Sequence, residues 1–358
     1  MKKFLTLTLA LLMVVSMFAG TAMAEEPLKV ICLLNGNLGD KSFFDSAAAG
    51  IGLINENIEN VEATYVEMGY DSSVWATTLA DVSEGDYDII IVGTYQLQDA
   101  LQEIAPQYPD NKYIIFDSNV DYSAGDCENV YSISFKQNEA SYLAGALAAM
   151  MAEKEGKDTI SAVAAMEIPV LYDFIVGYIQ GATDYNPEIK VITSYVGNFN
   201  DTAIAKELAE IQIKNGSAVC FNVAAQAGLG MIEAAAEAGV YAIGVDADQA
   251  EALAADGKTD IADNIVSSVM KNIDQVVYLS VQRHLAGELP YGTEEALGMT
   301  EKAVGIADAN QFFTSMTTEE MRAALTEMAE KINAGEIDVV SAFDADFDAA
   351  GYIAAVAP

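Results

Sequence analysis

Short apolar segments alternate with helical patterns along most of this chain, and this rhythm limits the folds that it can adopt. Residues 28–35 (LKVICLLN) form a compact, β-rich run, and Ala47, Ile51 and Ile54 then follow at the spacing of a helix face. Strand followed by helix followed by strand is typical of βαβ units, in which helices cover both faces of a parallel sheet. Further strands are expected at residues 61–68, 88–93, 112–117 and 130–135.

The same rhythm starts again after residue 137 and predicts a second doubly wound unit. Its expected helices are residues 138–154, 171–183, 202–214 and 228–238, and its expected strands are residues 159–166, 190–197, 218–222 and 241–246. A length of 358 residues agrees with two domains, at roughly 100–200 residues each.

The last third of the chain does not repeat the rhythm. We expect one long helix over residues 269–285, irregular chain with short strands over 291–305, and a final helix that opens with the capping box Thr317-x-x-Glu320. Too few strands remain for a third sheet, so this tail must complete the first two. The chain therefore crosses between two lobes more than once, and the expected lobes are residues 25–136 with 267–295, and residues 137–266 with 296–358.

Charge excludes several classes of partner. The chain has 54 Asp and Glu against 17 Lys and Arg, a formal net charge of −37. Nucleic-acid affinity comes chiefly from Lys and Arg on phosphates, and anionic lipid also attracts basic segments, so neither is an expected partner. One His and three Cys without a C-x-x-C spacing predict no metal site and no cofactor.

The N-terminus has the pattern of a secretory signal peptide. Met1, Lys2 and Lys3 precede an apolar run, and Ala22-Met23-Ala24 fits a cleavage site, so residues 1–24 are predicted to be removed. The apolar run is shorter than the ~20 residues that span a membrane. The mature protein is expected outside the cytoplasm, in the periplasm or on the outer cell surface. No cysteine near the cleavage site offers a lipidation acceptor.

Ligands of open α/β sheets bind beyond the carboxyl ends of the strands, so the residues after each strand are the candidates for a site. The first such turn begins at Asn35 and matches neither a dinucleotide fingerprint nor a P-loop. Asp40 is predicted to cap the following helix. Phe43 and Phe44 are adjacent in its first turn, and neighbours in a helix point about 100° apart, so we expect one of them to face a cleft.

Aromatic and acidic side chains recur at the other strand ends. Asp117 ends one strand, Phe199 and Asn222 follow two others, and Asp246 and Asp248 follow a fourth. Aromatic faces stack on a flat ring, and a carboxylate accepts vicinal hydroxyls. The pattern suits a base or another ring that carries a polyol, and stacking contributes roughly 1–3 kcal/mol per base.

Catalytic patterns are weak, and we do not expect an enzyme. His284 is the only histidine; it lies within a predicted helix, and no G-x-S-x-G elbow accompanies it. The carboxylates are too numerous for spacing alone to identify an acid–base pair.

The chain resembles the basic membrane protein family, the purine nucleoside receptor group of substrate-binding proteins for ABC importers. The resemblance starts at Asp40-Lys41-Ser42-Phe43, the family's DKSF signature, and covers nearly all of the mature chain. Further matching segments follow in the family's order at residues 139–145 (EASYLAG), 168–178 (IPVLYDFIVGY), 195–201 (YVGNFND), 228–230, 243–249 (IGVDADQ) and 267–274 (SSVMKNID).

This resemblance implies the type I periplasmic-binding-protein fold, an α/β fold in which two Rossmann-like lobes with parallel sheets are joined by a multi-crossing hinge. It also implies that Phe43 and Phe199 sandwich a base. Asp246, or alternatively Asp248, would take the ribose hydroxyls, Lys271 would donate near the hinge, and Asp117 would bond the base or sugar edge.

The chain departs from the family at three points. Asn35 stands where an acid is common, Phe44 stands where Asn is usual, and a lipobox cysteine is missing. The first two changes alter the hydrogen bonds at the pocket mouth, and the third leaves membrane tethering open.

The resemblance implies a monomeric binding protein that delivers a purine nucleoside or related nucleobase compound to ABC permease subunits. Alternatives are a binding protein for another aromatic heterocycle such as a flavin, a sensor component that presents its ligand to a receptor, and, as the weakest, a nucleoside hydrolase.

Overall fold

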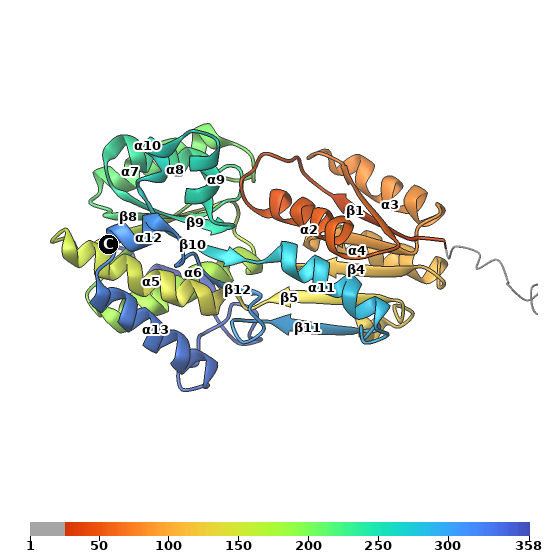
Figure 1. Cartoon of the computed structure of the whole chain (residues 1–358). Coiled ribbons are helices and arrows are strands. Elements are labelled where there is room, and N and C mark those ends of the chain that lie inside the picture. The colour runs from red at the N-terminus through yellow and green to blue at the C-terminus, as the bar shows by residue number, and fades with distance from the viewer. Residues whose placement is uncertain (1–25) are drawn as a thin grey trace, which may run out of the picture.

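The computed structural model describes residues 26–358, and the predicted signal peptide lies outside this range. Two six-stranded sheets form the centres of two lobes that lie side by side (Figure 1). In spatial order the first sheet contains β11 (Thr293–Leu297), β5 (Val130–Phe135), β4 (Lys112–Phe116), β3 (Ile89–Gly93), β1 (Leu28–Leu34) and β2 (Val61–Glu67). The second contains β12 (Val304–Ile306), β10 (Ile265–Lys271), β9 (Tyr241–Asp246), β8 (Val219–Val223), β6 (Thr159–Ala164) and β7 (Lys190–Tyr195).

The strand pairing confirms the doubly wound α/β expectation for both lobes. Every pair in the first sheet is parallel, and in the second sheet only β12 runs antiparallel to its neighbour β10. Strands such as β3 and β8 are buried along their whole length, because helices cover both faces of the sheet.

Helices of the first lobe divide between the two faces of its sheet. Side chains of β1 alternate between a core with α2 and α11 and a core with α3 and α4, as the period of two in a strand requires. These helices are α2 (Phe43–Asn57), α3 (Trp75–Ser83), α4 (Tyr95–Ile104) and α11 (Ile273–Leu285), with short 3₁₀ turns at Ser72–Val74, Ala105–Gln107 and Tyr122–Ala124.

Helices of the second lobe include one close-packed pair. The pair is α5 (Gln137–Lys154) and α6 (Pro169–Tyr185). A Cβ on Gly145 would lie 1.9 Å from the backbone oxygen of Tyr178, so the two backbones approach too closely for any side chain there. The remaining helices are α7 (Thr202–Lys214), α8 (Leu229–Ala238), α9 (Gln249–Ala255), α10 (Thr259–Ala262), α12 (Gln311–Met316), α13 (Glu319–Asn333) and α14 (Ala349–Ala355).

The chain crosses from one lobe to the other after β5, after β10 and after β11, and the elements that follow these crossings are α5, α11 and β12. Multiple crossings were predicted, but their positions differ from the expected boundaries. β10 belongs to the second sheet through Lys271, beyond the boundary expected at residue 266, and β11 extends the first sheet to Leu297, beyond residue 295.

Two local predictions were wrong. The helix expected over residues 269–285 begins only at Ile273, because Val269 to Lys271 belong to β10, where they pair with β12 on one side and, up to Met270, with β9 on the other. The final helix begins at Glu319, and its N-cap is Thr318, whose hydroxyl accepts from the Met321 amide at 3.2 Å. The Thr317 hydroxyl instead donates to the Phe313 carbonyl at 2.6 Å, which ends α12.

Candidate functional site

A cavity of about 80 Å³ lies between the lobes, where the carboxyl ends of strands from both sheets face each other. Seven of the nine residues predicted as ligand-binding line it: Asn35, Phe43, Phe44, Asp117, Phe199, Asp246 and Lys271. A larger groove of about 1150 Å³ runs along the hinge and shares Tyr95, Asp117 and Val170 with the cavity. The cavity therefore lies next to a wider space between the lobes.

Phe43 and Phe44 both line the cavity, whereas the sequence predicted one of them at a cleft. Their rings meet edge to face, with centroids 5.3 Å apart, and both side chains are buried. Phe44 fills the space beside Gly36, where an added Cβ would lie 2.1 Å from its ring. The absence of a side chain at Gly36, in the first strand-end turn, therefore leaves room for the Phe44 ring.

Asp40 fixes the first turn of α2. Ser42 is the N-cap residue, but the buried Asp40 carboxylate accepts hydrogen bonds from the Ser42, Phe44 and Asp45 amides at 2.8–3.1 Å. Burial raises the pKa of Asp40 to about 6, against the opposing effect of these amides. The predicted capping role is thus performed from two residues before the N-cap position, and it holds Phe43 and Phe44 in place.

Asp117 and Asp246 occupy matching positions in the two lobes. Asp117 directly follows β4 and Asp246 is the last residue of β9, and both have a left-handed backbone conformation, with φ of 62° and 63°. The Ser42 hydroxyl donates to Asp246 Oδ2 at 2.5 Å across the space between the lobes. Burial raises the pKa of Asp246 to about 6, while the Lys271 charge opposes this rise.

Lys271 forms an ion pair that joins the lobes. Its Nζ lies 2.6 Å from Asp117 Oδ1, and both side chains are almost fully buried. The ammonium also lies 4.9 Å from the ring centroid of Phe174 and 5.8 Å from that of Phe43, within the range of cation–π attraction. Burial raises the pKa of Asp117, and the neighbouring Lys271 opposes that rise.

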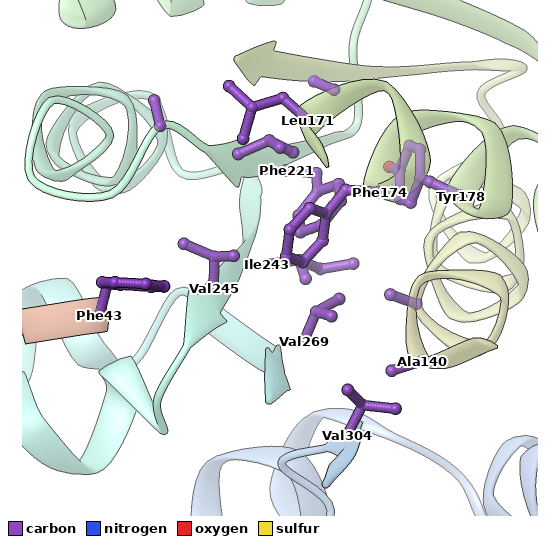
Figure 2. Close-up of a cluster of buried hydrophobic side chains, with 14 of the residues drawn as sticks. Phe43, Ala140, Leu171, Phe174, Tyr178, Phe221, Ile243, Val245, Val269 and Val304 are labelled. Atoms are coloured by element: carbon purple, nitrogen blue, oxygen red, sulfur yellow. The ribbon is translucent and has the colours of Figure 1, made fainter. Parts of the chain in front are cut away.

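Rings reach the cavity from both lobes. Phe43 comes from α2 of the first lobe, and Phe199 comes from the turn after β7 in the second lobe. Figure 2 shows Phe174, Phe221 and Tyr178 gathered in the second lobe's core, with Phe43 approaching Val245 from another segment. Phe43 and Phe199 therefore line the same cavity although they are 156 positions apart in the sequence.

Asn222 and Asp248 do not line the cavity, which corrects their expected position. Asn222 is fully buried, and it bonds the Ala224 amide at 2.8 Å and the Gln249 side chain at 3.1 Å. Asp248 caps α9 by accepting from the Glu251 amide at 3.2 Å, and it accepts from Asn310 Nδ2 at 2.7 Å. Hydrogen bonds within the second lobe therefore engage both side chains.

Several cavity residues were missed by the sequence analysis. Thr94, Tyr95 and Gln96 follow β3, so the rule applied to the other strand ends could have identified them. Tyr70 follows β2 in the same way, and its hydroxyl donates to Gln226 at 2.9 Å. Phe174 carries no such signal, because it lies inside α6 and reaches the cavity only through the packing of that helix.

The only histidine of the chain lies apart from this cavity. His284 is half-buried on α11, with Nδ1 2.9 Å from the Tyr291 hydroxyl. Within residues 26–358 no group of three or more His, Cys, Asp or Glu side chains is arranged to hold a metal ion. In the same range, no helix has the length and apolar character required to cross a membrane.

One family profile and several known proteins match most of the chain. The sequence profile of the family described as "ABC transporter substrate-binding protein PnrA-like" matches residues 28–339. The "CD4+ T-cell-stimulating antigen" of Listeria monocytogenes is 28% identical over 317 residues, which are 85% of each chain. "Basic membrane protein D" of Borreliella burgdorferi is 29% identical over 79% of each chain.

Solved structures give the same fold. An ABC transporter solute-binding protein from Aeropyrum pernix K1 superposes with a TM-score of 0.77 at 26% identity, covering 92% of this chain and all of that one. AraP, an arabinose binding protein from Geobacillus stearothermophilus, superposes with a TM-score of 0.59 at 17% identity, covering 79% of this chain and 97% of that one. The predicted type I periplasmic-binding-protein fold is confirmed.

Proposed function

The chain belongs to the PnrA-like family of ABC transporter substrate-binding proteins, and from this premise we propose that it binds a purine nucleoside or a related nucleobase compound between its lobes. It would then deliver this ligand to permease subunits in the membrane. Export by residues 1–24 and a monomeric state in solution are parts of the same proposal.

One observation carries the choice of ligand: aromatic rings from both lobes line the same cavity as two buried carboxylates. Phe43 and Phe199 supply the rings, and Asp117 and Asp246 supply the acids. A base stacked between rings gains roughly 1–3 kcal/mol per stack, and a hydrogen bond to a charged group contributes roughly 1.5–3 kcal/mol. Two contacts of each kind support micromolar binding, which requires about −8 kcal/mol.

Charge and size favour a neutral, compact ligand. Two acids face one lysine at the cavity, and the chain as a whole has a charge of −37, so a nucleotide phosphate would meet repulsion.

At about 80 Å³ the cavity is smaller than the ~300 Å³ at which small-molecule sites begin. Side chains that line the cavity must therefore rearrange for a nucleoside to fit between the closed lobes, and a flavin requires a larger rearrangement.

Ligand-stabilised closure of the lobes is the mechanism that we propose. Besides the ion pair of Lys271 with Asp117, polar contacts that join the lobes near the cavity include Ser42 with Asp246 at 2.5 Å, Tyr70 with Gln226 at 2.9 Å and Lys41 with Asp256 at 2.8 Å. These pairs depend on the lobes being close together. A ligand that touches both lobes favours the closed state by its higher affinity for that state.

The test is a panel of nucleosides, free bases and flavins, measured by thermal shift and by titration calorimetry on the purified chain. We expect stabilisation by at least one purine nucleoside and none by flavins. Mass spectrometry of co-purified small molecules is an independent readout. If no nucleoside or base stabilises the protein, the ligand proposal fails while the family and the fold stand. Conversion of a bound nucleoside to base and sugar would contradict a role limited to binding.

A further inference from the structure

Asn35 leaves one buried polar atom of the cavity wall without a partner. The side chain is 1% exposed and lines the cavity, and its Oδ1 has no hydrogen-bond partner among residues 26–358. A buried acceptor without a donor is costly, so such an atom in a binding cavity points to a donor on the ligand.

The amide nitrogen of the same side chain is held by the turn after β3. Asn35 Nδ2 donates to Thr94 Oγ1 at 3.1 Å and to Gln96 Oε1 at 2.9 Å. Thr94 is the N-cap of α4, so its oxygen also accepts from the Gln96 amide, and its own proton is directed to Gln96 Oε1. With Nδ2 engaged on that side, Oδ1 remains as the free polar atom of the amide.

Thr94 adopts this position at a cost in backbone strain. Its φ is 116°, which is rare for a β-branched residue and costs on the order of 1–3 kcal/mol. A glycine would adopt this backbone freely but would lack the hydroxyl. The strain is consistent with a requirement for the Thr94 oxygen beside Asn35.

We propose that Thr94 and Gln96 are positioning residues that orient Asn35, so that its Oδ1 accepts a hydrogen bond from an N–H group on the base. This inference rests on the proposed function and narrows its substrate class to nucleobase compounds with an N–H donor on the base edge. A base that has only acceptors leaves Oδ1 unpaired when the lobes close.

Purine riboside is the matched probe, because its base carries no N–H group. Its affinity is compared by calorimetry with those of adenosine, inosine and guanosine. We expect purine riboside to bind roughly 5- to 150-fold more weakly than the tightest of the three. Equal affinities would overturn the inference and leave the proposed function intact. Absence of binding by any nucleoside would overturn both.

Variants separate orientation from general damage. Thr94→Val removes the oxygen that orients Asn35, so the ratio of the affinity for the tightest nucleoside to the affinity for purine riboside should fall toward one. Thr94→Ser keeps the hydroxyl and should keep this affinity ratio. Gln96→Leu removes the other oxygen that holds the Asn35 amide, at an exposed side chain, and should also reduce the affinity ratio. Asn35→Asp has two equivalent acceptors, so adding Thr94→Val to it should leave the preference unchanged.

The affinity ratio is the readout, because a loss of folding lowers both affinities together. Melting temperatures identify variants that do not fold, and the purine riboside comparison on the unmodified chain needs no variant. A folded Thr94→Val protein with the full preference would refute the positioning role.

Discussion

Replacing Lys271 with Met should weaken ligand binding far more than it weakens folding. The Lys271 ammonium and the Asp117 carboxylate are 2.6 Å apart and buried, and they come from different lobes. Breaking a buried pair by removing one partner costs about 3–5 kcal/mol, because the other charge stays buried without a partner. When the lobes open, water can reach Asp117, so we expect this cost to fall on closure and therefore on affinity.

The expected loss is roughly 150- to 5,000-fold in Kd, since 1.4 kcal/mol corresponds to a factor of ten. Burial already raises the pKa of Asp117, and loss of Lys271 removes the charge that opposes this rise. When the lobes of the Lys271→Met variant close, Asp117 should therefore take up a proton. The affinity of this variant for its ligand should improve as the pH falls.

A double-mutant cycle with Asp117→Asn separates the ion pair from any direct contact of Lys271 with the ligand. Each variant is titrated by calorimetry, and each unliganded variant is unfolded with urea. We expect Lys271→Met with Asp117→Asn to bind more tightly than Lys271→Met alone, because no buried charge is left unpaired. Additive losses in affinity, or an equal loss in the free energy of unfolding of the unliganded protein, would refute the reasoning.

Three further variants test the cavity and its framework. Phe199→Ala should lose about 1–3 kcal/mol of binding free energy by calorimetry if the ring stacks on a base; Tyr65→Ala, at a side chain that is 38% exposed and does not line the cavity, is the matched control and should bind normally. Because the pKa of Asp246 is raised to about 6, its carboxylate becomes protonated as the pH falls, and affinity should drop roughly tenfold between pH 7 and pH 5. Asp246→Asn should bind more weakly and lose this dependence, and an unchanged pH profile would count against a role for Asp246 as a charged acceptor. Gly145→Ala should lower the free energy of unfolding by about 1–3 kcal/mol or more, because its Cβ meets backbone at 1.9 Å, whereas Gly52→Ala has open space and should not destabilise; equal melting temperatures would show that α5 and α6 can separate without cost.

Strand-end residues were the part of the site that sequence could predict. Parallel strands bring their carboxyl ends to one edge, so the pattern of strands along the chain is enough to group Asn35, Asp117 and Asp246. The same rule also selected Asn222 and Asp248, which hydrogen-bond to nearby backbone amides and do not line the cavity. Position along the chain does not say whether a polar side chain points into a cleft or caps the next helix.

The sequence by itself determined the two doubly wound lobes, because burial of a parallel sheet on both faces requires continuous apolar strands between amphipathic helices. It also determined the first turn of α2, where Asp40 acts on amides only a few residues away. Only the tertiary structure decided that Val269 to Lys271 form a strand, since the partners that select it lie in β9 and β12. It also decided that Lys271 pairs with Asp117, 154 residues away, and that Phe174 reaches the cavity from within α6. Such contacts depend on how the lobes pack together, and no local pattern in the chain encodes them.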